Sequence, residues 1–120
     1  MFKMATRKNN QFITGKKVEL HFGTIDNLKY SASSFDIIYE SNVHFFWKNP
    51  SKEFSKLLNF IKPGGKLVIK FQPRWVKGDE ELKKVTEITK RDFENAGFKN
   101  IMNDFKDMKP ITCIFIAGYK

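Results

Sequence analysis

Cysteine is nearly absent from this 120-residue sequence, which contains only Cys113. A single thiol can form no internal disulfide and supplies no cysteine cluster for zinc, so core packing is its expected role. The histidines and aspartates also lack metal-ligand spacing, and no serine stands in a nucleophile elbow. These absences exclude the common zinc motifs and hydrolase signatures, and we expect no metal site.

Long apolar runs are absent too. The longest, at residues 43–47 and 113–117, are far too short to span a bilayer, and no apolar block follows the basic N-terminus to form a secretory signal. We therefore expect a cytoplasmic protein without a membrane partner. The length and the 41% of hydrophobic residues fit one globular domain over residues 1–120.

Arginine is scarce although the formal net charge is +9, because only Arg7, Arg74 and Arg91 accompany the lysines. Arginine provides the bidentate contacts that phosphates and guanine edges favour, so scattered lysines are better explained as a solvated surface. The composition argues against nucleic acid as a partner. An RNA-binding or RNA-methylating role is an alternative that rests on charge alone.

Apolar patterns divide the chain into elements. Alternating or continuous apolar residues predict strands at residues 18–22, 35–39, 67–71, 100–105 and 111–117. Helical spacing predicts helices over residues 1–13, from Pro50 to the turn at 63–65, and over 79–96 with a break near Thr89. The first helix offers Phe2, Ala5 and Ile13 for burial. This order is typical of an α/β domain with a mostly parallel sheet and a closing antiparallel hairpin.

Short motifs occur along the chain in a fixed order. Residues 18–28 combine a strand pattern with a loop, Ser34-Phe35-Asp36 opens the next strand, and residues 42–50 lead through an aromatic pair and a proline into a helix. Pro63-Gly64-Gly65 then precedes a strand, and Ala96-Gly97-Phe98 ends the last helix. Together these motifs resemble the class I, Rossmann-like methyltransferases that depend on S-adenosylmethionine, of the small-molecule, type 11-like group.

The resemblance implies methyl transfer from S-adenosylmethionine, the expected cofactor, to a small-molecule acceptor. It places Thr24 and Ile25 at the adenine ring. It also assigns Glu40, Ser41 and Asn42 to the cofactor cleft, since ligands of open α/β sheets bind at the carboxyl ends of strands.

The expected substrate residues are Phe45, Arg74 and Trp75, which follow two strands in the same family pattern. His44 is a weak candidate for a catalytic base, because its charge changes near neutral pH. The alternative is that His44 is a packed residue, as its apolar neighbours suggest.

The sequence departs from the family pattern at its beginning. It has neither the glycine-rich turn after a first strand nor the acidic residue that ends a second strand, so it looks N-terminally truncated, with the first two strands of the family fold missing. We expect Val18, Leu20, Ile37 and Leu67 to lose neighbours, and exposed strand edges to promote self-association. As given, the chain is expected to need the missing strands for catalysis. The alternative is a noncatalytic α/β interaction module, or methyltransferase remnant.

Overall fold

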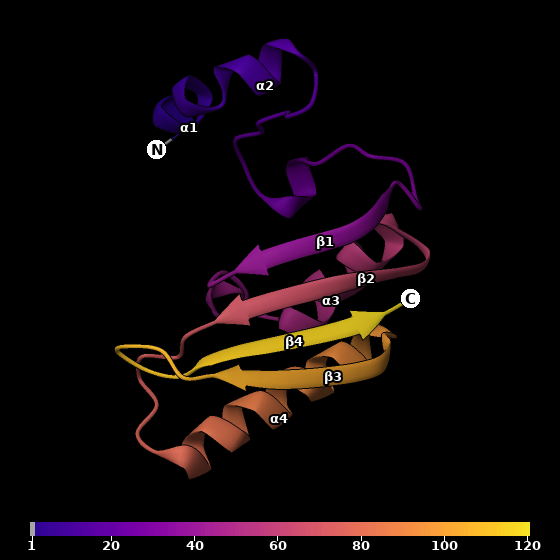
Figure 1. The fold of residues 1–120 in the computed structure, drawn as a ribbon. Coiled ribbons are helices and arrows are strands. Elements are labelled where there is room, and N and C mark those ends of the chain that lie inside the picture. The colour runs from indigo at the N-terminus through magenta and orange to yellow at the C-terminus, as the bar shows by residue number, and fades with distance from the viewer. Residues whose placement is uncertain (1) are drawn as a thin grey trace.

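The computed structural model describes residues 2–120 and contains one four-stranded sheet with helices on one face (Figure 1). The strands are β1 (Phe35–Ser41), β2 (Ile61–Phe71), β3 (Lys99–Lys106) and β4 (Cys113–Tyr119). Their order across the sheet is β1-β2-β4-β3. β1 and β2 are parallel, whereas β4 is antiparallel to both β2 and β3, so the predicted closing hairpin is confirmed.

The strand predicted at residues 18–22 is wrong. This segment is not part of the sheet, and no described segment pairs with it. Alternating apolar residues do not make a strand by themselves, because the backbone groups of a strand need a partner along their edge. The parallel part of the described sheet is therefore limited to the β1–β2 pair.

β2 begins at Ile61, directly after the preceding helix, and not near Leu67 as predicted. The pairing shifts between Phe35, opposite Ile61, and Ile37, opposite Lys66, so the Pro63-Gly64-Gly65 turn bulges out of the ladder. A Cβ added at Gly65 would lie 2.5 Å from the carbonyl oxygen of Asp36, which explains why this position holds glycine.

Both long helices start as their sequences predict, but the first ends at Phe60, before the turn at residues 63–65 that was expected to stop it. In α3 (Pro50–Phe60), the side-chain Oδ1 of Asn49 accepts a hydrogen bond from the backbone N–H of Lys52 at 3.2 Å. α4 (Asp79–Ala96) ends at Gly97, whose φ of 106° is left-handed. The break expected near Thr89 is wrong, since its hydroxyl donates to the carbonyl of Val85 and the helix continues.

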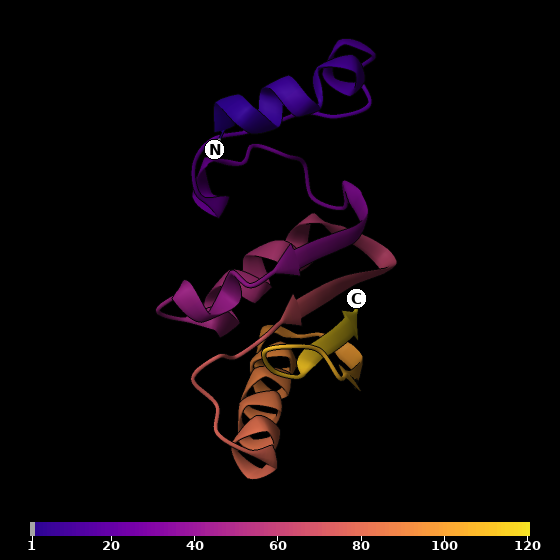
Figure 2. The same ribbon diagram turned by 60° about the vertical axis from the view of Figure 1, so that its left-hand side comes forward.

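The core lies between these helices and one face of the sheet. Figure 2 shows both helices on that side of the sheet. Leu67 is fully buried there, so the expectation that it loses neighbours is wrong, and Cys113 is buried as predicted. The core cluster consists of Phe54, Leu57, Ile61, Leu67, Ile69, Phe71, Val76, Leu82, Phe93, Ala96, Phe98, Ile114 and Ile116.

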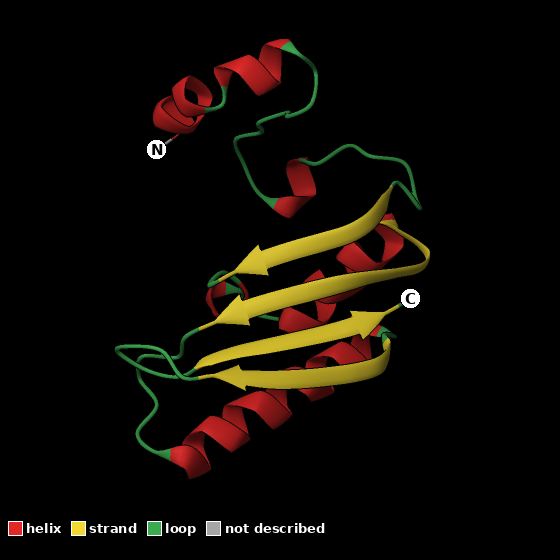
Figure 3. Cartoon of the chain, viewed as in Figure 1, coloured by secondary structure: helices red, strands yellow, loops and turns green. Residues whose placement is uncertain are grey.

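The opposite face of the sheet carries no helix in the described structure (Figure 3). Tyr39, Val68, Ala117 and Met102 form one row across all four strands, and directly paired residues point to the same side of a sheet. Tyr39 and Met102, at the two ends of this row, are 58% and 59% exposed. Ile37 is 56% exposed, as expected for a residue without neighbours.

Residues 2–34 form an arm that extends beyond β1 (Figures 1 and 2). The helix predicted for residues 1–13 is two short helices, α1 (Phe2–Lys8) and α2 (Asn10–Thr14), and Met1 lies outside the described residues. Phe2, Ala5 and Ile13 are not buried, which corrects the predicted burial. The radius of gyration is 15.6 Å, above the roughly 13–14 Å of a compact domain of this length, because the arm extends away.

Candidate functional site

Asn42 joins the carboxyl ends of the parallel strands β1 and β2. Its backbone N–H donates to the carbonyl of Lys70 at 2.9 Å, and its side-chain Oδ1 accepts from the backbone N–H of Gln72 at 3.0 Å. Its φ of 56° is left-handed, a conformation that asparagine tolerates better than most residues. Asn42 therefore fixes the spacing of the two strand ends at the edge where open α/β sheets bind ligands.

A buried carboxylate holds the turn that follows β1. Glu40 lies in one row with Ile69 and Ile116 on the helix-covered face and is 8% exposed. Its Oε1 accepts hydrogen bonds from the backbone N–H groups of Val43 and His44, the first residues around the short helix η2 (His44–Phe46). A charged acceptor suits such free N–H groups at a helix start.

The His44 ring lies beside this carboxylate, with Nδ1 at 3.4 Å from Oε1 of Glu40. Neither Nδ1 nor the second carboxylate oxygen, Oε2, has a hydrogen-bond partner, and both atoms are inaccessible. The ring packs among phenylalanines, with centroid distances of 4.5 Å to Phe71 and 5.5 Å to Phe45. His44 is therefore a packed residue whose polar Nδ1 faces a carboxylate.

A cavity of about 380 Å³ opens at the same strand ends. The rings of Phe45 and Trp75, both in its lining, contact each other edge-to-face with centroids 5.2 Å apart, and Phe46 is 77% exposed. The structure thus brings together four predicted site residues and adds two that the prediction missed, Phe46 and Gln72. The full lining is Asn42, Phe45, Phe46, Gln72, Arg74 and Trp75.

Thr24 and Ile25 lie apart from this cavity. Thr24 precedes the short helix η1 (Ile25–Asn27), where its backbone N–H donates to Oδ1 of Asn27 at 2.7 Å. It lines a cavity of about 230 Å³ between residues 21 and 28 of the arm, whereas the cavity at Asn42 is lined by residues of other segments. The sequence-based grouping of these residues with Glu40, Ser41 and Asn42 therefore remains a prediction.

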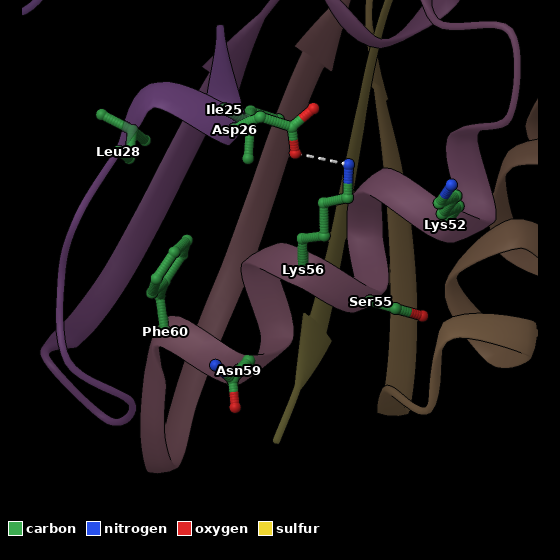
Figure 4. A pocket seen from close by; sticks show the side chains of 8 residues that line it. All are labelled: Ile25, Asp26, Leu28, Lys52, Ser55, Lys56, Asn59 and Phe60. Carbon is green, nitrogen blue, oxygen red and sulfur yellow. Dashed lines mark hydrogen bonds and ion pairs between the residues drawn. The ribbon is translucent and has the colours of Figure 1, made fainter.

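A further cavity, of about 540 Å³, lies between the arm and α3 (Figure 4). Lys56 of α3 donates to Asp26 at 2.7 Å and to Glu53 at 3.1 Å, and Ile25 and Phe60 are among the apolar lining residues. The hydrogen bond from Lys56 lowers the pKa of Asp26, and the same bond raises the pKa of Lys56. The sequence could not show this pair, because its members are 30 residues apart.

The described residues contain no group of three or more His, Cys, Asp or Glu side chains that could hold a metal ion. No helix of residues 2–120 is long and apolar enough to cross a membrane.

Comparison with known proteins identifies the family. Residues 1–69, more than half of the chain, match the methyltransferase domain family. The chain belongs to this family. It is 32% identical over 111 residues to the uncharacterized methyltransferase YdaC of Bacillus subtilis (strain 168), covering 92% of the chain and 59% of YdaC. The chain thus spans less than two thirds of this curated relative.

Solved structures confirm the Rossmann-like α/β fold of this methyltransferase domain. A SAM-dependent methyltransferase from Aquifex aeolicus has a TM-score of 0.67 at 20% identity, over 98% of the chain and 62% of its own. The [4+2]-cyclase SpnF has a TM-score of 0.72 at 12% identity, over 99% and 62%. Geranyl diphosphate C-methyltransferase of Streptomyces coelicolor A3(2) has a TM-score of 0.69 at 9% identity, over 98% and 59%.

Proposed function

We propose that the protein containing this chain transfers a methyl group from S-adenosylmethionine to a small-molecule acceptor, in the cytoplasm. Family membership supports the reaction class, and the Aquifex aeolicus structure of similar fold is a SAM-dependent methyltransferase. The single observation that carries the proposal is the cavity at the carboxyl ends of β1 and β2, which Asn42 holds at a fixed spacing.

The residues at this edge fit a cationic, ring-bearing cofactor. Phe45, Phe46 and Trp75 present aromatic rings to the cavity, and the faces of such rings attract cations. Amide groups of Asn42 and Gln72 provide polar contacts beside them. We assign the sulfonium end of the cofactor to this edge, with Ser41 and Asn42 as contacts. Thr24 and Ile25 are the proposed adenine contacts, on the arm.

Glu40 is proposed to position the turn that carries the cofactor contacts. Its carboxylate is engaged by the N–H groups of Val43 and His44, so it fixes the turn that carries Phe45. We propose that the other carboxylate oxygen, Oε2, whose hydrogen-bonding capacity is unused, strengthens the attraction of this edge for a cation.

Phe45, Arg74 and Trp75 are the proposed acceptor contacts. S-adenosylmethionine, when bound, supplies an electrophilic methyl carbon, so the protein mainly has to align the acceptor atom and exclude water. The touching rings of Phe45 and Trp75 can form one apolar wall for the acceptor, and the exposed Arg74 can attract an anionic group on it. Any proton removal by His44 would use Nε2, because Nδ1 is inaccessible and faces Glu40.

Calorimetric titration of S-adenosylmethionine and S-adenosylhomocysteine into the 120-residue chain tests this proposal. We expect saturable binding of both, weakened about tenfold or more in Asn42→Ala, since about 1.4 kcal/mol of lost contact energy has that effect. Asn103→Ala, an asparagine change on β3 away from the cavity, is the matched control. Absence of saturable heat with the unaltered chain, or equal weakening by both variants, would contradict the assigned site.

A noncatalytic interaction module is the second candidate function. It is favoured by the uncovered sheet face and by the position of Thr24 and Ile25, which line a cavity of the arm separate from the cavity at Asn42. The same titration separates the two candidates, because a module without cofactor chemistry would bind neither ligand.

A further inference from the structure

Two buried polar atoms lie side by side at the end of β1 without hydrogen-bond partners in the described structure. They are Nδ1 of His44 and Oε2 of Glu40, and both are inaccessible to solvent. A segment that docks on the surface cannot reach them, so the residues already around them set their environment. Buried polar atoms without partners are uncommon in folded proteins, and a functional role is one reason for keeping them.

The surroundings of His44 offer one polar side chain, that of Glu40. The buried polar side chains of residues 2–120 are Glu40, His44, Thr86 and Thr89. The two threonine hydroxyls donate to carbonyl groups of their own helix, α4, and are therefore already engaged. The rest of the His44 ring contacts phenylalanines. The carboxylate of Glu40 is thus what decides the state of the imidazole.

The position of the imidazole proton follows from this contact. A neutral imidazole carries one N–H, on either nitrogen. A proton on Nε2 would leave a lone pair on Nδ1, which lies 3.4 Å from Oε1 of Glu40, itself an acceptor. Two acceptors that face each other repel, and the low dielectric of the interior makes this costly. A proton on Nδ1 would instead face the carboxylate and be attracted to it.

The carboxylate cannot turn away from the ring without a loss. The backbone N–H groups of Val43 and His44 both donate to Oε1 of Glu40. Moving Oε1 would leave these two donors unpaired. The same bonds fix the turn that carries Phe45, whose ring centroid lies 5.5 Å from that of His44. The carboxylate therefore sets the position of the turn and the orientation of the imidazole together.

We propose that Glu40 is a positioning residue that holds His44 in the Nδ1–H tautomer. In this tautomer the lone pair lies on Nε2, which is the form that any proton removal by His44 requires, and an imidazolium formed in this way faces a carboxylate. The use of His44 in methyl transfer rests on the proposed function, whereas its tautomer does not.

Nitrogen-15 NMR of the imidazole tests the tautomer without any cofactor. His21→Gln leaves His44 as the single histidine of the chain. We expect a protonated Nδ1 and an unprotonated Nε2, with the Nδ1–H protected from exchange with water because Nδ1 is inaccessible. The calorimetric titration with S-adenosylhomocysteine is a separate measurement, so failure of cofactor binding is distinguishable from failure of this inference.

Two further changes at Glu40 separate positioning of the proton from packing. Glu40→Gln should retain the Nδ1–H signal, because the two backbone N–H groups keep the amide oxygen in the place of Oε1. Glu40→Leu should lose this signal and protonate Nε2, because no acceptor then faces Nδ1. Glu87→Leu, which removes an exposed carboxylate of α4, is the matched control and should leave the tautomer unchanged.

Three results would overturn the proposal. They are a protonated Nε2 in the His21→Gln chain, loss of the Nδ1–H signal in Glu40→Gln, and its persistence in a folded Glu40→Leu variant. Circular dichroism shows whether each variant is folded. Where Glu40→Leu does not fold, the first two results decide.

Discussion

The outer strands β1 and β3 belong to one sheet but differ in sequence, in pairing and in exposure. β3 is antiparallel to β4 and has an almost entirely exposed, polar and lysine-bearing sequence, so it ends the sheet against water. β1 is parallel to β2, ends in the candidate site, and exposes Ile37 and Tyr39 on the helix-free face. The comparison teaches that β3 meets water with a mostly polar sequence, whereas β1 combines a ligand site at its end with apolar side chains on the helix-free face.

The largest expected effect is on stability, and it compares a buried side chain of α4, which packs under the sheet, with an exposed side chain of β3. Phe93→Ala should lower the free energy of unfolding by about 3–5 kcal/mol, because its ring is fully buried between α4 and the sheet. Phe105→Ala, on β3 and 42% exposed, should cost less than about 1 kcal/mol. Urea denaturation of both variants measures the difference. Equal losses would mean that the outer surface of β3 contributes as much as the core.

The second prediction compares the stability cost of changing the two end residues of another row across the sheet. Glu40 on β1 pairs with Ile69, which pairs with Ile116, which pairs with Asn103 on β3. Glu40→Ala should cost about 1–3 kcal/mol, because it frees two backbone N–H groups and leaves the Nδ1 of His44 without its neighbouring carboxylate.

Asn103→Ala is the control for Glu40→Ala and should change stability by less than about 0.5 kcal/mol, since the side chain is exposed. Thermal unfolding followed by circular dichroism compares the two. A cost for Glu40→Ala no greater than that of the control would show that the carboxylate does not hold the turn after β1.

The smallest effect concerns the arm beside β1. Because the pKa of Asp26 is lowered in the folded state, its pairing with Lys56 stabilises the fold above the unfolded pKa of about 3.9 and is lost as the pH falls through the folded value. Lys56→Met should therefore slightly lower the melting temperature at neutral pH and have no such effect in strong acid. Lys84→Met, at an exposed position of α4 that forms no ion pair in the described structure, controls for loss of a surface lysine. A Lys56→Met effect that does not change with pH would contradict the role of the ion pair.

Local sequence signals predicted the helix ends that have capping residues in the sequence, and the strands that are continuous apolar runs. Asn49-Pro50 and Gly97 fixed one end each of α3 and α4, and the apolar runs near Leu67 and Ile114 became central strands. The carboxyl-end position of Asn42, Phe45, Arg74 and Trp75 also followed from the order of elements, and the structure joins these four around one cavity.

Contacts between distant residues could not be predicted in this way. The pattern at residues 18–22 is as regular as that of β1, yet it forms no strand, because no partner lies beside it in the described structure. The Lys56–Asp26 pair and the contribution of Gln72 to the cavity depend on how the arm, α3 and β2 come together.

The sequence by itself determined the family, the α/β order, and the glycine turn at residues 63–65, because these depend on short-range steric and capping rules. Only the tertiary structure decided that Glu40 turns into the helix-covered face and that residues 18–22 form no strand. The physical reason is that burial and strand pairing are properties of the surroundings of a residue, and a backbone edge is closed only by another backbone.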